Sequence, residues 1–209
     1  MLNHHLPSIL ETRLAQPLPG WRCQAPFQPE LSFGRHRGPA PFGVRPAAVL
    51  LLIYPGQFGW NVPLMLRPLH MPDHGGQISL PGGMIETGES SQQAALREYH
   101  EELGAPPDHV QLLGPLTPLY LFASNFQISP WVGCVSARPA WTPSQREVER
   151  LLEIPLTHLL APESVGHVER RQRGLAFRAP CYQWQSERIW GATCMILAEF
   201  IAVIRELEL

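Results

Sequence analysis

The chain has 209 residues, and 44% of them are hydrophobic, which is enough for one domain with a sizeable core. Its 16 arginines against 18 aspartates and glutamates give a net charge of −2, which excludes a broad basic field for nucleic acids or membrane surfaces. The first residues lack the pattern of a signal peptide, no apolar run reaches membrane-spanning length, and the four cysteines are widely spaced. We therefore expect a cytoplasmic protein with reduced thiols that binds neither nucleic acid nor membrane.

Residues 1–45 are expected to form a Pro-rich N-terminal extension that precedes the main domain, 46–209. Within the extension, residues 6–16 fit a short helix, and the prolines that follow make regular structure hard to sustain. In the main domain, AAVLLLIYP at 47–55 predicts a buried strand. The segment VPLMLRP at 62–68, after a Gly-Trp-Asn turn, predicts its hairpin partner.

The clearest helix is predicted from Ser90 to Leu103. Ser90 opens a capping box with the glutamine three residues later, and Gly104 supplies the stop. Ala95, Tyr99 and Leu103 recur every four residues, so this stripe of the helix should pack on a sheet.

The remaining elements are mostly strands. We expect strands at 110–122, 126–135 and 165–184, a helical turn at 144–153 and a closing helix at about 190–207. Strands thus outnumber helices without a βαβ alternation. This pattern favours an α/β fold in which a mixed sheet lies between a few helices.

Three carboxylates of the predicted helix crowd one another. Glu98, Glu101 and Glu102 are three and four residues apart, so on a helix they share a face and repel. Either water screens them on an exposed face or a divalent cation binds between them. Oxygen-only ligands suit Mg²⁺ or Mn²⁺, and no cluster of His or Cys in the sequence indicates zinc. The Gly82-Gly83 turn before the helix lets the backbone come close to a phosphate or a metal.

The stretch from Gly83 to Gly104, GMIETGESSQQAALREYHEELG, resembles the Nudix box. All seven identities of that pattern are present, and two apolar slots are filled loosely by Tyr99 and Ala105; the identities are Gly83, Glu89, Arg97, Glu98, Glu101, Glu102 and Gly104. The resemblance implies a Nudix α/β/α sandwich over 46–209 that hydrolyses a pyrophosphate linkage. It also implies that Mg²⁺ or Mn²⁺ is held by Glu98, Glu101, Glu102 and the Gly83 backbone, with Glu89 behind them. The alternative interpretation of the same segment is a solvated, salt-bridged surface helix.

The segments around the box resemble the coenzyme A pyrophosphatase branch of this family. HGGQISLPGG at 74–83 is similar to the signature of that branch, and Arg67 stands where the branch has an arginine. The resemblance implies coenzyme A as the substrate and Arg67, Gln77 and Gly82 as substrate-binding residues, with Arg67 a candidate to bind the 3′-phosphate. The branch usually has Thr, Ser and Arg where this chain has Met65, Pro68 and Pro72.

In the implied mechanism, a metal-activated water attacks phosphorus and a carboxylate takes its proton. Glu98 is the first candidate for this base because Arg97 can orient it. Glu147 is the second, since it matches an acidic position that reaches toward the metals in many Nudix enzymes. The sequence leaves open other substrates (ADP-ribose, a dinucleotide or a nucleoside triphosphate) and a non-catalytic Nudix-like binding module. The expected partner is a small nucleotide, and a homodimer is left open.

A few residues outside the box carry weaker signals. Trp190 and Tyr120 fit core aromatics better than ligand-stacking groups, and His74 fits a turn. Arg35 and Arg37 fit a solubilising loop better than a phosphate site.

Overall fold

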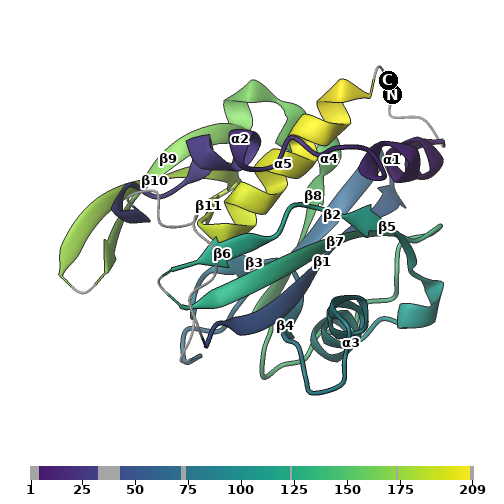
Figure 1. Ribbon diagram of the computed structural model, residues 1–209, viewed down its shortest axis with the longest axis horizontal. Helices are drawn as coiled ribbons and strands as arrows, with labels where there is room; N and C mark the ends of the chain where they lie inside the picture. Colours follow the sequence, from purple (N-terminus) through teal and green to yellow (C-terminus); the bar gives the residue numbers. More distant parts are fainter. Residues whose placement is uncertain (1–4, 33–42, 72–73, 123, 173, 208–209) are drawn as a thin grey trace.

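The computed structural model describes residues 5–32, 43–71, 74–122, 124–172 and 174–207, and Figure 1 shows their arrangement. Arg35, Arg37 and Pro72 lie outside these residues. The α-helices are α1 (Leu6–Leu14), α2 (Trp21–Gln24), α3 (Ser91–Leu103), α4 (Leu156–Leu160) and α5 (Ala192–Glu206). The strands are β1 (Arg45–Gly56), β2 (Gly59–Leu66), β3 (Ile78–Ser79), β4 (Gly82–Met84), β5 (Gln111–Pro115), β6 (Leu119–Leu121), β7 (Phe126–Cys134), β8 (Arg150–Pro155), β9 (Val165–Gln172), β10 (Leu175–Trp184) and β11 (Glu187–Trp190). Short 3₁₀ helices occur at Ala25–Phe27, Glu30–Ser32, Pro107–His109 and Pro162–Ser164.

Strand β1 is the centre of a mixed, eight-stranded sheet. On one edge it pairs antiparallel with β2 and β4, and on the other it pairs parallel with β7. β3 and β8 pair with β2, while β5 and β6 pair with β7. The predicted hairpin of β1 and β2 is confirmed, with Tyr54 opposite Asn61, and so is the mixed sheet.

Strand β1 is buried on both faces, as its unbroken apolar run predicts. Leu50, Leu52 and Tyr54 pack on the side of α3, whereas Leu51 and Ile53 pack on the side of the other helices. In Figure 1, α3 lies below the sheet and α1 and α5 lie above it. The expected α/β/α sandwich is therefore confirmed.

Helix α3 begins and ends where the sequence predicts. Ser90 Oγ accepts a hydrogen bond from Gln93 N at 3.2 Å, and Gln93 Oε1 accepts one from Ser90 N at 2.9 Å, which completes the capping box. Gly104 ends the helix at φ 69°, a left-handed conformation that glycine adopts without strain. Tyr99 and Leu103 are fully buried against the sheet, so this stripe determines where the acidic residues of α3 point.

The opposite face of the sheet is covered by α5 and by the N-terminal segment. Eleven of the fifteen residues of α5 are buried. Helix α1 adds Leu6, Leu10 and Leu14 to the same core, and the three-stranded sheet β9–β11 packs beside it. No helix within the described residues is long and apolar enough to cross a membrane. All four cysteines are free thiols, and three of them are buried.

A buried carboxylate joins the N-terminal segment to α5. Glu199 accepts hydrogen bonds from Gly20 N at 3.0 Å, Gln24 Nε2 at 2.9 Å, Thr117 N at 3.1 Å and Thr117 Oγ1 at 2.5 Å. These four donors compensate the charge for its loss of water. Residues 5–32 of the predicted extension are therefore packed on the main domain.

Three expected elements differ from the structure. The runs at 110–122 and 165–184 each form two strands. The first run breaks at Pro115 and Pro118, because proline has no N–H to donate to a strand ladder. The helical turn expected at 144–153 is wrong beyond residue 148. Val148 N bonds Ser144 O at 2.9 Å, but residues 150–155 form β8. Their buried side chains alternate along the segment, and β2 supplies the ladder partner, so strand pairing prevails over the helical turn.

Candidate active site

Two glycines of β4 bring its backbone against the acidic helix. A Cβ atom at Gly83 would lie 2.3 Å from Glu98 Oε1, and one at Gly82 would lie 2.4 Å from Ala48 O. Neither position has room for a side chain. The Glu98 carboxylate therefore lies directly on the backbone of β4.

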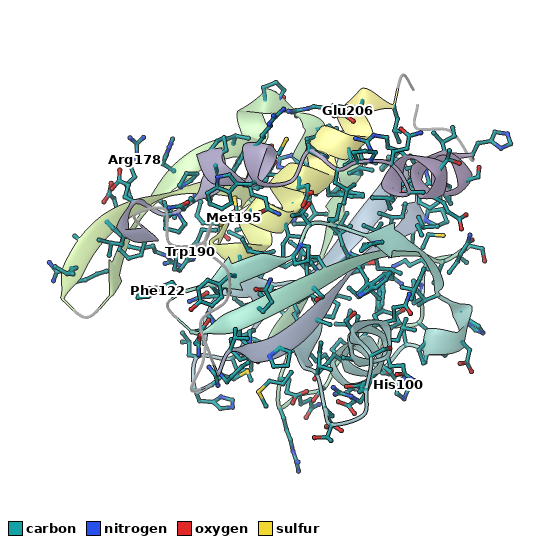
Figure 2. All side chains as sticks on the ribbon, viewed as in Figure 1. His100, Phe122, Arg178, Trp190, Met195 and Glu206 are labelled. Atoms are coloured by element: carbon teal, nitrogen blue, oxygen red, sulfur yellow. The ribbon has the colours of Figure 1, made fainter. Side chains whose placement is uncertain are left out.

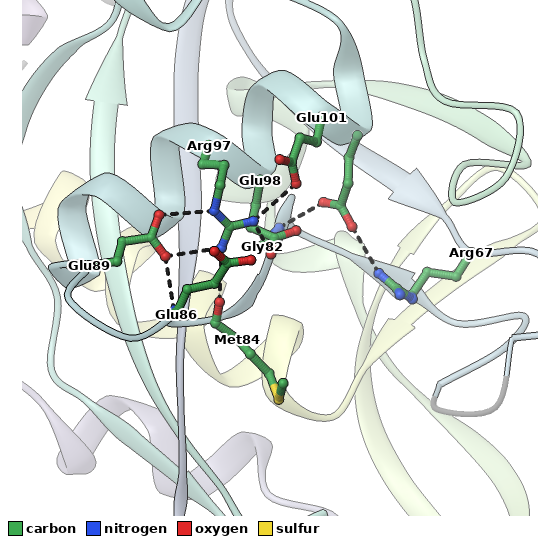
Figure 3. A network of polar contacts seen from close by, with 9 residues as sticks. Arg67, Gly82, Met84, Glu86, Glu89, Arg97, Glu98 and Glu101 are labelled. Atoms are coloured by element: carbon green, nitrogen blue, oxygen red, sulfur yellow. Dashed lines mark hydrogen bonds and ion pairs between the residues drawn. The ribbon is translucent and has the colours of Figure 1, made fainter.

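Arg97 is the centre of the acidic cluster, which we define as Arg97 with Glu89, Glu98, Glu101 and Glu102 (Figure 3). Its Nε and NH2 atoms bond the two oxygens of Glu89 at 2.9 and 3.1 Å, and NH2 also bonds Met84 O at 3.0 Å. Its NH1 bonds Glu98 at 2.8 Å and Glu101 at 3.0 Å. All five N–H donors of a guanidinium are thus used inside the protein. The Arg97 guanidinium lowers the pKa of Glu89, and it can hold Glu98 as the sequence predicts.

Glu102 is the most buried carboxylate of the cluster, with 3% of its side chain exposed. It accepts hydrogen bonds from Gly82 N at 2.8 Å and from Arg67 NH1 at 3.1 Å. Burial nevertheless raises the pKa of Glu102 to about 8, and the negative charges of Glu98 and Glu147 add to the rise. Burial thus disfavours the charged form of this side chain, and a cation beside it would favour that form.

Glu98 and Glu147 form the part of the site that could move a proton. Burial raises the pKa of Glu98, and although Arg97 opposes this rise, Glu101 and Glu147 reinforce it. The turn that carries Glu147 is held to the end of α3, because Ser144 N bonds the carbonyl of Glu102 at 2.8 Å. Glu147 thus lies close enough to raise the pKa of both Glu98 and Glu102.

The three predicted substrate-binding residues lie next to one another. Arg67 N bonds Gln77 O at 3.0 Å, which closes the loop between them, and Arg67 NH1 reaches Glu102. The Gln77 side chain bonds Nδ1 of His74 at 3.2 Å, and His74 has a left-handed φ of 60°, typical of a turn. Arg67, Gln77 and Gly82 all line one cavity.

The cavity has a volume of about 550 Å³ and extends from β4 to the start of α5. Its wall includes Gly82, Gly83 and Met84 of β4, so the two features share this strand. Four aromatic side chains also line it, namely Phe122, Phe126, Phe177 and Trp190. A volume of this size is typical of a site for a small molecule.

The site has the composition of a divalent cation site without its closed geometry. Among the described residues, no three His, Cys, Asp or Glu side chains are grouped as metal ligands. Glu98 and Glu101 both bond Arg97, and Glu102 bonds Gly82 and Arg67. Yet the ligand atoms on offer are all oxygens, and the Glu98 carboxylate lies against the backbone of Gly83, so the chemistry of these donors fits Mg²⁺ or Mn²⁺.

Sequence reasoning found the acidic cluster and missed most of the cavity. Trp190 lines the cavity, although its sequence context favours a core aromatic, whereas Tyr120 is a buried aromatic whose hydroxyl bonds Asn125. Ser79 and Ser124 also line the cavity, and no spacing in the sequence marks them. Met65, one of the departures from the coenzyme A branch, is fully buried in the core on the α3 side.

Comparisons with known proteins agree with the box. The chain matches the NUDIX domain over residues 44–170. The relative "Uncharacterized Nudix hydrolase NudL" of Salmonella paratyphi B is 33% identical over 137 residues, which cover 65% of this chain and 71% of that protein. The fold is similar to the Nudix hydrolase RenU of M. smegmatis, with a TM-score of 0.56, 18% identity, and 88% of this chain and 96% of that chain covered. It is also similar to the MutT protein of Methanosarcina mazei Go1, with a TM-score of 0.50, 17% identity, and 79% and 96% of the two chains covered.

Proposed function

Because this chain belongs to the NUDIX hydrolase family, we propose that it cleaves the pyrophosphate linkage of coenzyme A or its derivatives. The products would be 4′-phosphopantetheine and 3′,5′-ADP. The observation that carries the proposal is the junction at β4, where the acidic cluster meets a cavity large enough for the rest of such a substrate. The acidic cluster supplies the chemistry, and the cavity supplies the choice of substrate.

The metal in this proposal is Mg²⁺ or Mn²⁺, held by Glu98, Glu101, Glu102 and the Gly83 backbone. When bound, such an ion neutralises the pyrophosphate and lowers the pKa of a water molecule. The raised pKa of Glu102 supports this role, because a cation beside this buried carboxylate would compensate the burial that now disfavours its charge.

Glu98 is the proposed base. Arg97 bonds Oε1 of Glu98, and we assign the proton of the attacking water to Oε2. Burial and the neighbouring carboxylates raise the pKa of Glu98, which increases its affinity for that proton. The water oxygen then bonds phosphorus, the P–O–P bond breaks, and the leaving phosphate keeps the bridging oxygen. Glu147 is the second candidate because it lies beside Glu98.

The choice of coenzyme A rests on the loop from Arg67 to Gly82 and on the charge of the cavity. Arg67 holds Glu102 through NH1, while its Nε atom has no partner among the described residues and can donate to a substrate phosphate. Met65 lies in the core away from the cavity, so its departure from the coenzyme A branch does not alter the wall of the cavity.

A substrate screen tests this proposal. The purified protein would be assayed with coenzyme A, ADP-ribose, a dinucleotide and a nucleoside triphosphate, each with Mg²⁺ and with Mn²⁺. We expect the highest kcat/KM for coenzyme A. A much higher value for ADP-ribose or a dinucleotide would overturn the coenzyme A assignment and leave the hydrolase assignment intact.

A further inference from the structure

The cavity beside β4 contains buried polar atoms that lack partners. Within the described part of the chain, Arg67 Nε, Ser79 Oγ, Ser124 Oγ and Trp190 Nε1 are buried without a hydrogen bond, and all four residues line the cavity. Folded proteins leave few such atoms unsatisfied. Each of them is an N–H or O–H group, so a ligand that presents hydrogen-bond acceptors would satisfy the whole set.

Most of the other side chains in the wall are apolar, and its charged side chains are arginines. Phe122, Trp190 and Met195 come together where the first turns of α5 approach the sheet (Figure 2). The described part of the wall contains two arginines, Arg45 and Arg67, and no aspartate or glutamate. It therefore contains no carboxylate. The other polar groups are already engaged, since Gln77 bonds His74 and the Thr193 hydroxyl donates to Ile78 O at 3.1 Å. Arg67 Nε and Trp190 Nε1 can only donate a hydrogen bond, while the hydroxyls of Ser79 and Ser124 can donate or accept one.

Much of this wall lies outside the segment that matches the NUDIX domain, 44–170. Leu31 comes from the N-terminal segment, Phe177 from β10, Trp190 from β11 and Met195 from α5. Glu30 accepts a hydrogen bond from the backbone of Arg178 at 3.0 Å, which ties the N-terminal segment to β10. The cavity is therefore a feature that segments on both sides of the matched domain build together.

We propose that this cavity binds the uncharged, amide-bearing arm of the substrate, which in coenzyme A is the pantetheine chain. The inference rests on the proposed coenzyme A hydrolase function. Trp190 Nε1 and the hydroxyls of Ser79 and Ser124 donate to carbonyl oxygens of the arm, while the aromatic wall packs on its methylene groups. Adenine presents an amino group that donates, and the described part of this wall contains no carboxylate to accept from it. The arm enters past Gly82 and Gly83, which leaves the pyrophosphate beside Arg67 and the acidic cluster.

The test is calorimetric titration of the two products, 4′-phosphopantetheine and 3′,5′-ADP, into the full chain with Mg²⁺. The variants are Trp190→Phe, which keeps a ring beneath the Arg170 guanidinium and removes one N–H, and Ser79→Ala, which removes one hydroxyl. The matched control is Trp131→Phe, whose indole N–H donates to Ser91 Oγ at 3.1 Å, away from the cavity. Each cavity variant should weaken 4′-phosphopantetheine about 3- to 10-fold, the effect of one lost hydrogen bond. Binding of 3′,5′-ADP should stay within about 2-fold, and Trp131→Phe should change neither.

Two results would overturn the inference. If Trp190→Phe and Ser79→Ala weaken 3′,5′-ADP and spare 4′-phosphopantetheine, the cavity holds the nucleotide half. If neither product responds, the arm does not reach these groups. The titration also separates this inference from the proposed function. If the wild-type chain fails to hydrolyse coenzyme A but binds 4′-phosphopantetheine with the expected dependence on Trp190, then the function falls and the cavity assignment stands.

Discussion

The acidic cluster and the cavity meet at β4 and differ in how the chain builds them. The cluster comes from one segment, Glu89 to Glu102, and Arg97 alone connects most of it. The cavity is assembled from segments as far apart in the sequence as Leu31 and Met195, and its described wall contains Arg45 and Arg67 but no aspartate or glutamate. A compact local motif can therefore set the reaction, while distant segments select the molecule that undergoes it.

Removing divalent cations should have the largest effect and should act on the cluster alone. A chelator should abolish hydrolysis, and Mg²⁺ or Mn²⁺ should restore it, whereas Ca²⁺ should not because its coordination is larger and looser. The assay measures the formation of the phosphate-ester products, with and without added metal. Full activity in the chelator would contradict the role of the acidic cluster.

Glu98→Gln should lower kcat by roughly two to four orders of magnitude, because the amide cannot accept the proton of water. The fold should survive, since a glutamine side chain has nearly the same size and shape as the glutamate that it replaces. Steady-state kinetics and thermal unfolding of Glu98→Gln and Glu147→Gln, measured side by side, check this. Near-normal turnover in Glu98→Gln together with a loss in Glu147→Gln would move the base to Glu147.

Glu199→Leu tests whether the N-terminal wall of the cavity depends on its buried anchor. The change strands the donors of Gly20, Gln24 and Thr117, so the free energy of unfolding should fall by about 3 kcal/mol. The control is Arg13→Ala, which removes a more exposed ion pair to Glu206 at 2.5 Å and should cost less than about 1 kcal/mol. Urea denaturation measures both. If both variants lose the same free energy of unfolding, then Glu199 stabilises the N-terminal segment no more than an exposed ion pair does.

Arg67 is the residue where the cluster and the cavity meet, so its variants sharpen the comparison. If Arg67 binds the 3′-phosphate, Arg67→Ala should reduce the preference for coenzyme A over dephospho-coenzyme A by about 10-fold, the effect of one lost charge-assisted bond. Arg67→Lys should rescue only part of it, because an ammonium lacks the planar fork of a guanidinium. The ratio of the two kcat/KM values reports this. A constant ratio would restrict Arg67 to holding Glu102.

The smallest expected effect is a pH dependence of stability in the metal-free protein. Burial raises the pKa of Glu102 from 4.5 to about 8, so the folded state holds this proton more tightly than the unfolded state. Stability from this group is therefore complete below pH 4.5 and is lost as the pH rises toward 8. In chelator, Tm should therefore fall as the pH rises across this range. Glu102→Gln should flatten the curve, and a wild-type curve that is already flat would contradict the shift.

Local patterns were sufficient wherever the interactions themselves are local. The capping box at Ser90, the stop at Gly104 and the stripe through Tyr99 appear as predicted, because a helix satisfies its ends and its packing face within a few turns. The apolar run of β1 likewise predicted a buried strand, since both of its faces pack. The same spacing rules placed Glu98 and Glu102 beside each other.

Other features were decided by tertiary structure. Residues 150–155 became a strand because β2 offers a ladder, a partner that no local pattern reveals. The burial that raises the pKa of Glu102 comes from packing against β4 and Arg67. By itself, the sequence determined the acidic helix and the reaction class, because both depend on residues within one segment. Only the fold decided that Leu31, Ser79 and Trp190 share a cavity, because hydrogen-bond donors can gather from distant segments only after the chain has packed.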